Sequence, residues 1–293
     1  MRFFDLHCDT AYEMYAQNKG FKQNDLAISL ERAKCLGEYK QVMALWCRND
    51  RTDEECFADF LEMHENFLRH SPVPASFGPF AFSLEDARLL CGDLERLDLL
   101  HSMGIKFLIP MWKGESIIGG AFDTDTGLTD FGKAVIERCF EIGIIPDISH
   151  CSLKSADEIL NMAEEKGGVV IASHSCSYSV YSHPRNLRDE QFLRIKELGG
   201  IVGLSLCAYH LTEKKEKCTA DDIMRHFEHY LSLSGEDFTC FGADMDGAPM
   251  PCGVSGIESI PMIYEMLCSR FGRKIANKLT YDNVSIFMEK NLK

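Results

Sequence analysis

The sequence predicts a single (β/α)8 barrel that spans residues 1–293, and three observations support this fold class. Eight short runs rich in apolar, β-branched or aromatic residues recur along the chain. Segments with helical periodicity separate these runs, and glycines follow several of the segments, as helix ends require. No Gly-x-Gly-x-x-Gly or Walker-type loop follows any run, so an open doubly wound sheet lacks its usual motif. Eight alternating units therefore favour a closed parallel barrel.

The expected elements follow in chain order. The eight strands are expected at residues 3–9, 41–47, 80–85, 106–112, 144–150, 169–174, 201–206 and 239–244. Helices are expected over 131–142 and 153–163, where apolar residues recur on one face, and near 54–69. Ser152 is a candidate N-cap for the second of these helices. Gly104, Gly143, Gly167 and Gly199 indicate turns from helix to strand. The chain contains no linker or low-complexity segment, so we expect one domain.

Composition and charge exclude several classes of partner. The formal net charge of −14 repels phosphate backbones and anionic lipid, so we expect no nucleic-acid and no membrane partner. No apolar run approaches the ~20 residues that a membrane-spanning helix needs, and Asp5 precedes any run long enough for a signal peptide. The 13 cysteines include no C-x-x-C pair. Residues such as Cys47, Cys139, Cys207 and Cys240 are therefore expected to be reduced and packed as small hydrophobes in a cytoplasmic protein.

Ionisable residues gather at the ends of the expected strands, where a barrel enzyme carries its chemistry. The residues in question are His7, Asp9, Glu85, His150, His174 and Asp244. A strand period of two places the first pair on one face, with Cys8 pointing away. Burying several ionisable groups in one barrel mouth costs free energy unless they bind something. Imidazoles combined with carboxylates suit Zn²⁺ or a similar divalent ion.

Each of these residues also has a structural alternative. Glu85 could be an acid at the entry of a helix, and His150 could belong to the capping region before the helix at 153–163. Arg185, on the loop after the sixth strand, is either a surface residue or a clamp for a substrate carboxylate. The remaining seven histidines are given structural roles, although His183 and His210 lie in loops that could approach the site.

Seven segments resemble one known family. They are residues 4–9 (FDLHCD), 127–132 (GLTDFG), 144–152 (IIPDISHCS), 170–175 (VIASHS), 185–186 (RN), 241–247 (FGADMDG) and 282–287 (DNVSIF). In order and pattern they are similar to the motifs of the membrane (renal) dipeptidases, peptidase family M19, among the amidohydrolase-type metal barrels. The resemblance runs through nearly the whole chain.

The resemblance implies a role for each strand-end residue. The site would hold two zinc ions, or another divalent metal, with five ligands: His7 and Asp9 on one ion, His150 and His174 on the other, and Glu85 bridging them. Arg185 would hold the free carboxylate of the substrate. Asp244 would handle the proton of the attacking water, which makes it the expected catalytic residue.

Two positions depart from the family pattern. Asp86 and Ala87 stand where the family usually has two glycines after its bridging glutamate. Trp112 stands where the family usually has a histidine that contacts the substrate carbonyl. We expect Trp112 and Tyr178 to line the substrate side of the site together with Arg185, and we expect the change at Trp112 to affect substrate choice and rate.

The resulting expectation is a zinc-dependent dipeptidase. It would hydrolyse small dipeptides that have a free C-terminal carboxylate, through a hydroxide that bridges the two metals. One alternative is another hydrolase on the same barrel, a phosphoesterase, lactonase or deaminase, since Arg185 could equally hold a phosphate. A second is a metal-binding barrel with impaired catalysis, which Trp112 supports. The oligomeric state stays open, with a homodimer among the alternatives.

Overall fold

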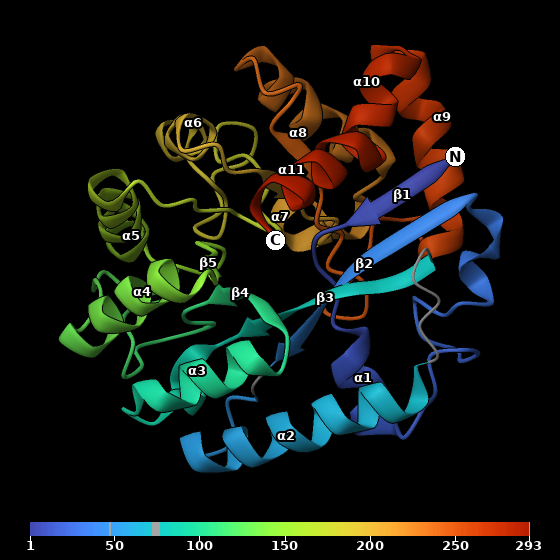
Figure 1. The fold of residues 1–293 in the computed structure, drawn as a ribbon. Helices are drawn as coiled ribbons and strands as arrows, with labels where there is room; N and C mark the ends of the chain where they lie inside the picture. Colours follow the sequence, from blue (N-terminus) through green and yellow to red (C-terminus); the bar gives the residue numbers. More distant parts are fainter. Residues whose placement is uncertain (47, 72–76, 293) are drawn as a thin grey trace.

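The computed structural model describes residues 1–46, 48–71 and 77–292 (Figure 1). Its main sheet has seven parallel strands in the order β5-β4-β3-β2-β1-β7-β6. The strands are β1 (Arg2–Asp5), β2 (Glu38–Trp46), β3 (Phe77–Glu85), β4 (Ile105–Ile109), β5 (Ile145–Pro146), β6 (Val202–Leu204) and β7 (Thr239–Phe241). Cys47, the last residue of the expected strand 41–47, lies outside the described residues.

The expected strand at 169–174 is present only as two isolated bridges. Ile171 pairs in parallel with Asp147, just after β5, and Ala172 pairs in parallel with Val202 in β6. These bridges join the two edges of the sheet, so that the seven strands and the segment at 171–172 close into a barrel. The backbone at residue 173 runs very close to its neighbours, since a Cβ at Gly203 or Gly242 would lie 1.8 or 1.7 Å from its carbonyl oxygen. Glycine is therefore required at both positions.

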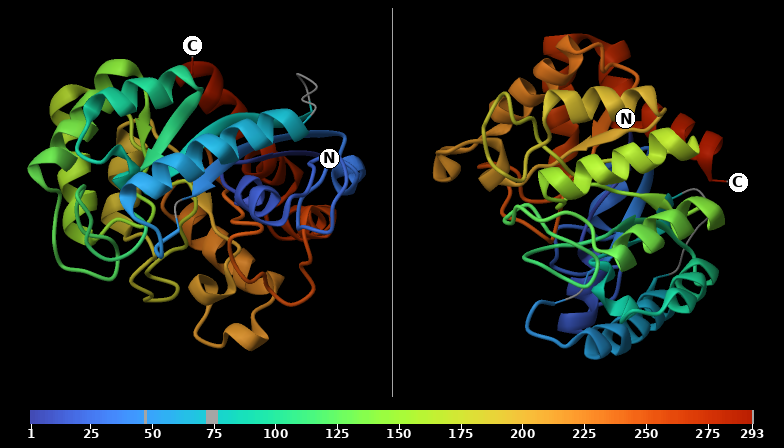
Figure 2. Two further views of the ribbon diagram at one scale, coloured as in Figure 1. Left: turned by 90° about the horizontal axis from the view of Figure 1, so that it is seen from below. Right: turned by 90° about the vertical axis from the view of Figure 1, so that its left-hand side faces the viewer.

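Helices surround the ring (Figures 1 and 2). They are α1 (Thr10–Gln17), α2 (Asp53–His70), α3 (Leu94–Ser102), α4 (Asp130–Ile142), α5 (Leu153–Lys166), α6 (Asp189–Glu197), α7 (Ala208–Leu211), α8 (Ala220–Ser232), α9 (Ile260–Phe271), α10 (Arg273–Asn277) and α11 (Asn283–Asn291). The helices expected at 54–69, 131–142 and 153–163 are confirmed as α2, α4 and α5. Ser152 caps α5, because its hydroxyl accepts from the backbone N–H of Ser155 at 3.0 Å.

Several expected strands end earlier than the sequence suggested. The strands expected at 144–150 and 239–244 stop at Pro146 and Phe241. His150 and Asp244, the residues at which these strands were expected to end, have φ of +70° and +60°. A residue with positive φ cannot continue an extended strand, so each chain turns out of the ladder before the polar side chain. β1 likewise ends at Asp5, before His7.

The interior of the barrel is apolar at the end where the strands begin. Phe4 points into the ring while its neighbour Phe3 packs in the outer core, as a strand period of two requires. The C-terminal segment covers this end: the hydroxyl of Tyr281 donates to Glu38 at the start of β2, and Nδ2 of Asn283 donates to the carbonyl of Thr239 at 2.7 Å. Polar chemistry is therefore confined to the opposite end.

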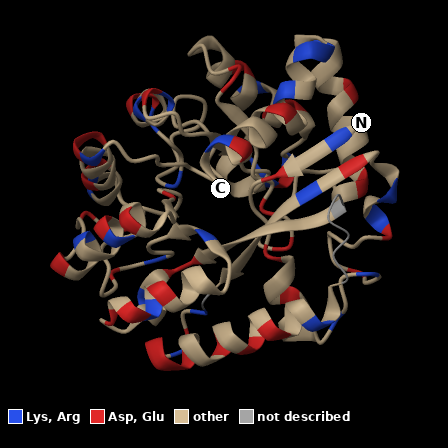
Figure 3. Cartoon of the chain, viewed as in Figure 1, with Lys and Arg blue, Asp and Glu red and all other residues tan. Residues whose placement is uncertain are grey.

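The outer helices carry both signs of charge (Figure 3). Exposed ion pairs such as Arg138 with Asp98 and Arg194 with Glu164 join neighbouring helices. Cys139, Cys207 and Cys240 are buried and form no disulfide, as expected. Cys47 is not among the described residues. Within the described ranges, no helix combines the length and apolar character needed to cross a bilayer.

Candidate metal centre and substrate pocket

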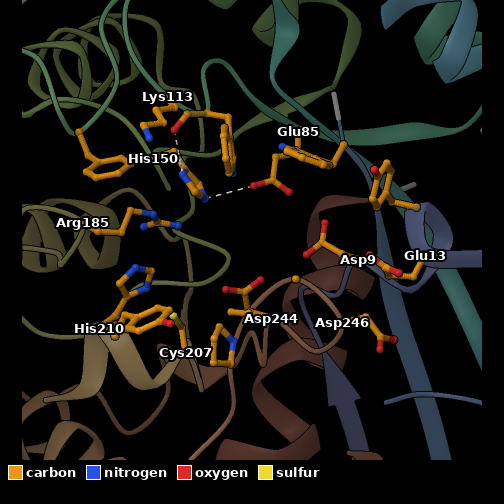
Figure 4. A pocket seen from close by; sticks show the side chains of 18 residues that line it. Asp9, Glu13, Glu85, Lys113, His150, Arg185, Cys207, His210, Asp244 and Asp246 are labelled. Carbon is orange, nitrogen blue, oxygen red and sulfur yellow. Dashed lines mark hydrogen bonds and ion pairs between the residues drawn. The ribbon is translucent and has the colours of Figure 1, made fainter. Parts of the chain in front are cut away.

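A cavity of about 520 Å³ opens at the carboxyl ends of the strands. This size falls in the range of small-molecule pockets, roughly 300–1,000 Å³. Six of the sequence-predicted residues line it: Asp9, Glu85, Trp112, His150, Arg185 and Asp244. Figure 4 shows Glu85, His150 and Asp244 facing one another across the open space.

His7 and Asp9 lie close together, although both follow the end of β1, so that the expected strand period does not apply to them. Nε2 of His7 lies 3.5 Å from Oδ2 of Asp9 and 3.9 Å from Oδ1 of Asp244. Cys8 points away into the core, with its Sγ beside Met43 at 3.3 Å. Asp9 occupies the N-cap position of α1, yet its side chain makes no capping hydrogen bond. Its carboxylate is therefore directed to the cluster and not to the helix.

Glu85 lies between two histidines. Its Oε2 lies 3.3 Å from Nε2 of His7, and its Oε1 lies 3.1 Å from Nε2 of His150. Nε2 of His174 lies 2.9 Å from Nε2 of His150, while the ring of His174 stacks on that of His7 with centroids 3.7 Å apart. The five residues expected as ligands thus form one continuous cluster, and the two oxygens of Glu85 face different parts of it.

The ionisation of the cluster depends on burial and on close charges. Burial, and then the neighbouring Glu85, raise the pKa of Asp9 to about 6. Burial works against ionised Glu85, but His7 and His150 hold its pKa far below the ordinary value. Burial likewise opposes charge on His7, yet Glu85 and Asp9 raise its pKa well above the ordinary value. The carboxylates therefore favour a cation among them, as a proton on His7 or as a metal ion.

The donor set fits divalent metal ions. The ligand atoms of His7, Glu85 and His174 lie within 4.8 Å of one another, as do those of His7, Asp9 and Asp244. Nδ1 of His7 is buried and makes no hydrogen bond to any described residue, although a buried imidazole normally needs a partner, and Nε2 faces the carboxylates of Asp9 and Glu85. Nδ1 of His150 lies 3.1 Å from the carbonyl oxygen of Trp112, which leaves Nε2 as the lone-pair donor.

Asp147 organises this part of the site, although no role was predicted for it. Its Oδ1 accepts from the backbone N–H of Ser149 at 2.9 Å and of Ser173 at 3.0 Å. These two residues directly precede His150 and His174, so one buried carboxylate fixes the backbone behind both imidazoles. The signal was present in the sequence, since Asp147 lies in the same short segment as His150.

Arg185 is buried against the cluster. Its Nη1 donates to Oγ of Ser175 and its Nη2 to the carbonyl oxygen of His174, each at 3.1 Å. Its Nε is buried and makes no hydrogen bond to a described residue. Burial lowers the pKa of this guanidinium, while Asp244 and Glu85 oppose that shift. A fixed cation that is not fully paired suits an anionic ligand group.

The two departures from the family pattern have visible consequences. Asp86 adopts φ of +77°, a conformation that glycine adopts freely, and its carboxylate compensates by accepting from the N–H of Arg88 and pairing with the Arg88 guanidinium. Trp112 packs edge-on against Trp46, with ring centroids 5.0 Å apart. Trp112 therefore forms pocket wall and holds His150 through its carbonyl oxygen.

The remaining predictions about the pocket have mixed outcomes. Tyr178 does not line this cavity in the described structure; it lines a neighbouring hollow, where the Arg188 guanidinium covers its ring at 4.0 Å. His210 does line the cavity, and its ring lies 4.9 Å from that of His183. The sequence left the role of His210 open and gave no signal for Glu13, because the placements of α7 and α1 around the cavity set both positions.

Comparisons with known sequences agree on one family. The family model described as membrane dipeptidase (peptidase family M19) matches residues 79–291. An uncharacterized dipeptidase of Schizosaccharomyces pombe is 26% identical over 196 residues, which cover 64% of this chain and 46% of that protein. Dipeptidase tcpJ of Claviceps purpurea is 26% identical over 200 residues, which cover 67% and 45%. The match thus spans less than half the length of these two relatives.

Solved structures share the fold. A metallopeptidase from Rhodobacter sphaeroides, liganded with a phosphinate mimic of the dipeptide L-Ala-D-Ala, superposes with a TM-score of 0.90 at 22% identity and covers 99% of both chains. Dipeptidase AC, a metallopeptidase of family M19, superposes with a TM-score of 0.89 at 22% identity and covers 99% of this chain and 98% of its own. At this level of identity the likeness establishes the barrel fold.

Proposed function

Because this chain belongs to the membrane dipeptidase family, peptidase family M19, we propose that it hydrolyses small dipeptides that have a free C-terminal carboxylate. The observation that carries the proposal is the cluster of His7, Asp9, Glu85, His150 and His174 beneath a cavity in which Arg185 is fixed. The proposed cofactor is a pair of zinc ions or of another divalent metal, which His7, Asp9, Glu85, His150 and His174 would hold. The similar metallopeptidase that carries a phosphinate dipeptide mimic supports the substrate class.

Bound metal ions supply Lewis acidity and lower the pKa of water from 15.7 towards ~7. The chain supplies the remaining functions. Arg185 pairs with the C-terminal carboxylate of the substrate and thereby fixes the scissile carbonyl over the cluster. Trp112 and the other cavity walls reduce the access of bulk water. His150 keeps its Nε2 directed at the cluster, because its Nδ1 is held by the carbonyl oxygen of Trp112.

Asp244 is the proposed proton carrier. Burial, and then the neighbouring carboxylate of Asp9, raise the pKa of Asp244 well above its ordinary value. A carboxylate in this position accepts a proton more readily than an exposed one, as a general base near neutral pH must. It would take the proton from the attacking water and return it to the leaving amine. Its φ of +60° turns the side chain into the pocket.

Hydrolysis of a dipeptide panel by zinc-loaded protein tests the proposal. The panel should contain L and D residues at the C-terminal position and, for each, a matched C-terminal amide. We expect turnover that chelation abolishes and zinc restores, and loss of turnover for the amides, which cannot pair with Arg185. Asp244→Asn should bind metal but lose turnover by at least ~10²-fold.

Three outcomes would contradict the proposal. Turnover that persists after full chelation would exclude the metal centre from the reaction. Cleavage of phosphoesters or lactones but not of dipeptides would replace the substrate class. A zinc-loaded protein that turns over none of these substrates would favour the impaired barrel that Trp112 suggests.

A further inference from the structure

The end of the cavity opposite Arg185 carries two carboxylates, Glu13 and Asp246, that have no part in the proposed chemistry. Figure 4 shows Arg185 and His210 on one side of the open space and Asp9, Glu13 and Asp246 on the other, with the metal-binding cluster between them. The pocket is therefore polarised, with a buried cation at one end and carboxylates at the other. A ligand whose carboxylate lies on Arg185 must extend its other end towards the acidic side.

Glu13 is the carboxylate on this side that is left to meet a ligand. Asp246 uses both oxygens within the protein, since Oδ2 accepts from the hydroxyl of Thr10 and Oδ1 from the N–H of Ala27, each at 2.6 Å. Glu13, on α1, is half-buried at the cavity wall, and the hydrogen bond found for its carboxylate among the described residues comes from the amide of Gln17. Gln17 is exposed, neutral and displaceable.

Aromatic rings form the wall beside Glu13. Tyr12, Trp46 and Trp112 all line the cavity. Trp46 contacts Tyr12 edge-on with centroids 4.9 Å apart and an interplanar angle of 86°, and it contacts Trp112 with centroids 5.0 Å apart at 63°. The faces of such rings attract cations within about 6 Å. A carboxylate beside a cluster of aromatic rings is a combination that binds an alkylammonium or guanidinium group.

We propose that Glu13, with the wall formed by Tyr12, Trp46 and Trp112, selects dipeptides whose N-terminal residue has a basic side chain, lysine or arginine. The inference rests on the proposed function, because the Arg185 clamp sets the direction of the substrate. Besides Arg185, the cavity is lined by the cation Lys113, which lies on the His150 side and not beside Glu13 (Figure 4). It therefore does not repel a basic side chain from the acidic end, and Arg48, which interacts with Tyr12, is paired with the carboxylate of Asp50.

The test compares lysine with norleucine, which has the same chain length without the charge. For zinc-loaded protein, kcat/KM is measured on Lys-Ala and norleucine-Ala, and Kd is measured for the two corresponding phosphinate pseudodipeptides. We expect a preference of about tenfold for lysine in both measurements, which corresponds to about 1.4 kcal/mol. Glu13→Gln should reduce the preference to about two- to threefold, the part that the aromatic rings retain.

Glu265→Gln is the matched control, since it removes an exposed carboxylate on α9, away from the cavity, and should keep the full preference. Equal kcat/KM and Kd for lysine and norleucine in the wild type would overturn the proposal. A preference that survives intact in Glu13→Gln would overturn the role of Glu13. If no dipeptide is cleaved, the proposed function fails, while the two Kd values still decide whether the basic side chain is selected.

Discussion

Nε2 of His150 lies 2.9 Å from Nε2 of His174. Burial lowers the pKa of His150 to about 4 and that of His174 well below its ordinary value, so both rings are neutral near pH 7. The Trp112 carbonyl oxygen holds Nδ1 of His150, so the lone pair of His150 is directed at the neighbouring ring. Two nitrogens at this distance require a proton or a metal ion between or beside them.

Metal binding should therefore stabilise the fold. Adding Zn²⁺ to chelated protein is expected to raise the unfolding free energy by about 4 kcal/mol at a metal concentration near 1,000 times Kd. Glu85→Gln, which removes the carboxylate between His7 and His150, should lose most of this gain. Calorimetry at several zinc concentrations provides the measurement. A melting temperature that is independent of zinc in the wild type would contradict the metal centre.

Gly247→Ala should disrupt the same centre by steric conflict. A Cβ at this position would lie 2.0 Å from Oδ2 of Asp9 and 2.6 Å from Oδ1 of Asp244. Both carboxylates would have to move, so we expect loss of bound metal and of activity by at least ~10²-fold. The control is Gly20→Ala, where the added Cβ meets only a carbonyl oxygen at 4.0 Å. Metal content by mass spectrometry tests this, and a fully loaded, active Gly247→Ala would refute it.

Asp147 should affect metal affinity without contacting the metal. Asp147→Ala removes the acceptor for the N–H groups of Ser149 and Ser173, which frees the backbone behind His150 and His174. Loss of such an outer partner typically weakens metal affinity about 10- to 100-fold. Asp147→Asn retains one oxygen and should lose less. Competition with a chromophoric chelator measures the affinity; equal values for Asp147→Ala and wild type would remove this role.

Arg185→Lys should separate substrate binding from chemistry. Lysine keeps the charge but cannot bond the carbonyl of His174, the hydroxyl of Ser175 and a substrate carboxylate at once. We expect KM for dipeptides to rise about 10- to 100-fold, with a smaller change in kcat. Steady-state kinetics on one dipeptide gives both constants. An unchanged KM would exclude Arg185 as the carboxylate clamp.

A buried histidine away from the site should make the fold sensitive to acid. Nδ1 of His226 accepts from the N–H of Ser177 at 3.0 Å, and its Nε2 lies 2.9 Å from the carbonyl of Leu211. Burial lowers its pKa from 6.5 to about 4. The unfolded chain thus binds a proton that the folded chain excludes between about pH 6.5 and 4, so stability is complete above this window and falls as the pH drops through it.

The expected loss between pH 7 and pH 5 from this group is about 2 kcal/mol. His226→Gln should be less stable at pH 7 but should show a pH dependence that is smaller by that amount. Urea unfolding of zinc-loaded protein at both pH values measures the difference. Parallel losses in wild type and variant would show that the folded protein protonates His226 as readily as the unfolded chain does, contrary to the argument.

The sequence predicted the barrel and the position of its polar mouth because parallel strands bring their carboxyl ends to one edge. His7, Asp9 and Glu85 meet for that reason. The exact strand ends were not predictable, because the positive φ of His150 and Asp244 depends on the packing around them. The regular strand expected at 169–174 was also overestimated, because two isolated bridges are enough there to close the ring.

Residues on loops and on helix faces were harder to predict than strand ends. Tyr178 was expected beside the substrate but lies in a separate hollow under Arg188. Glu13 and His210 line the cavity although no sequence motif predicts it. A loop has no fixed period, so its sequence does not state which side chain turns inward.

The ring is joined between β1 and β7, two strands that lie far apart in the sequence. β1 lies between β2 and β7, and the carboxylate of Asp5 accepts from the N–H of Ala243 at 2.7 Å. During synthesis β1 cannot gain its second neighbour until β7 has been made. His7 and Asp9 cannot meet Asp244 before that moment. A nascent chain that stops before β7 therefore lacks the assembled centre, and metal capture should follow the synthesis of β7.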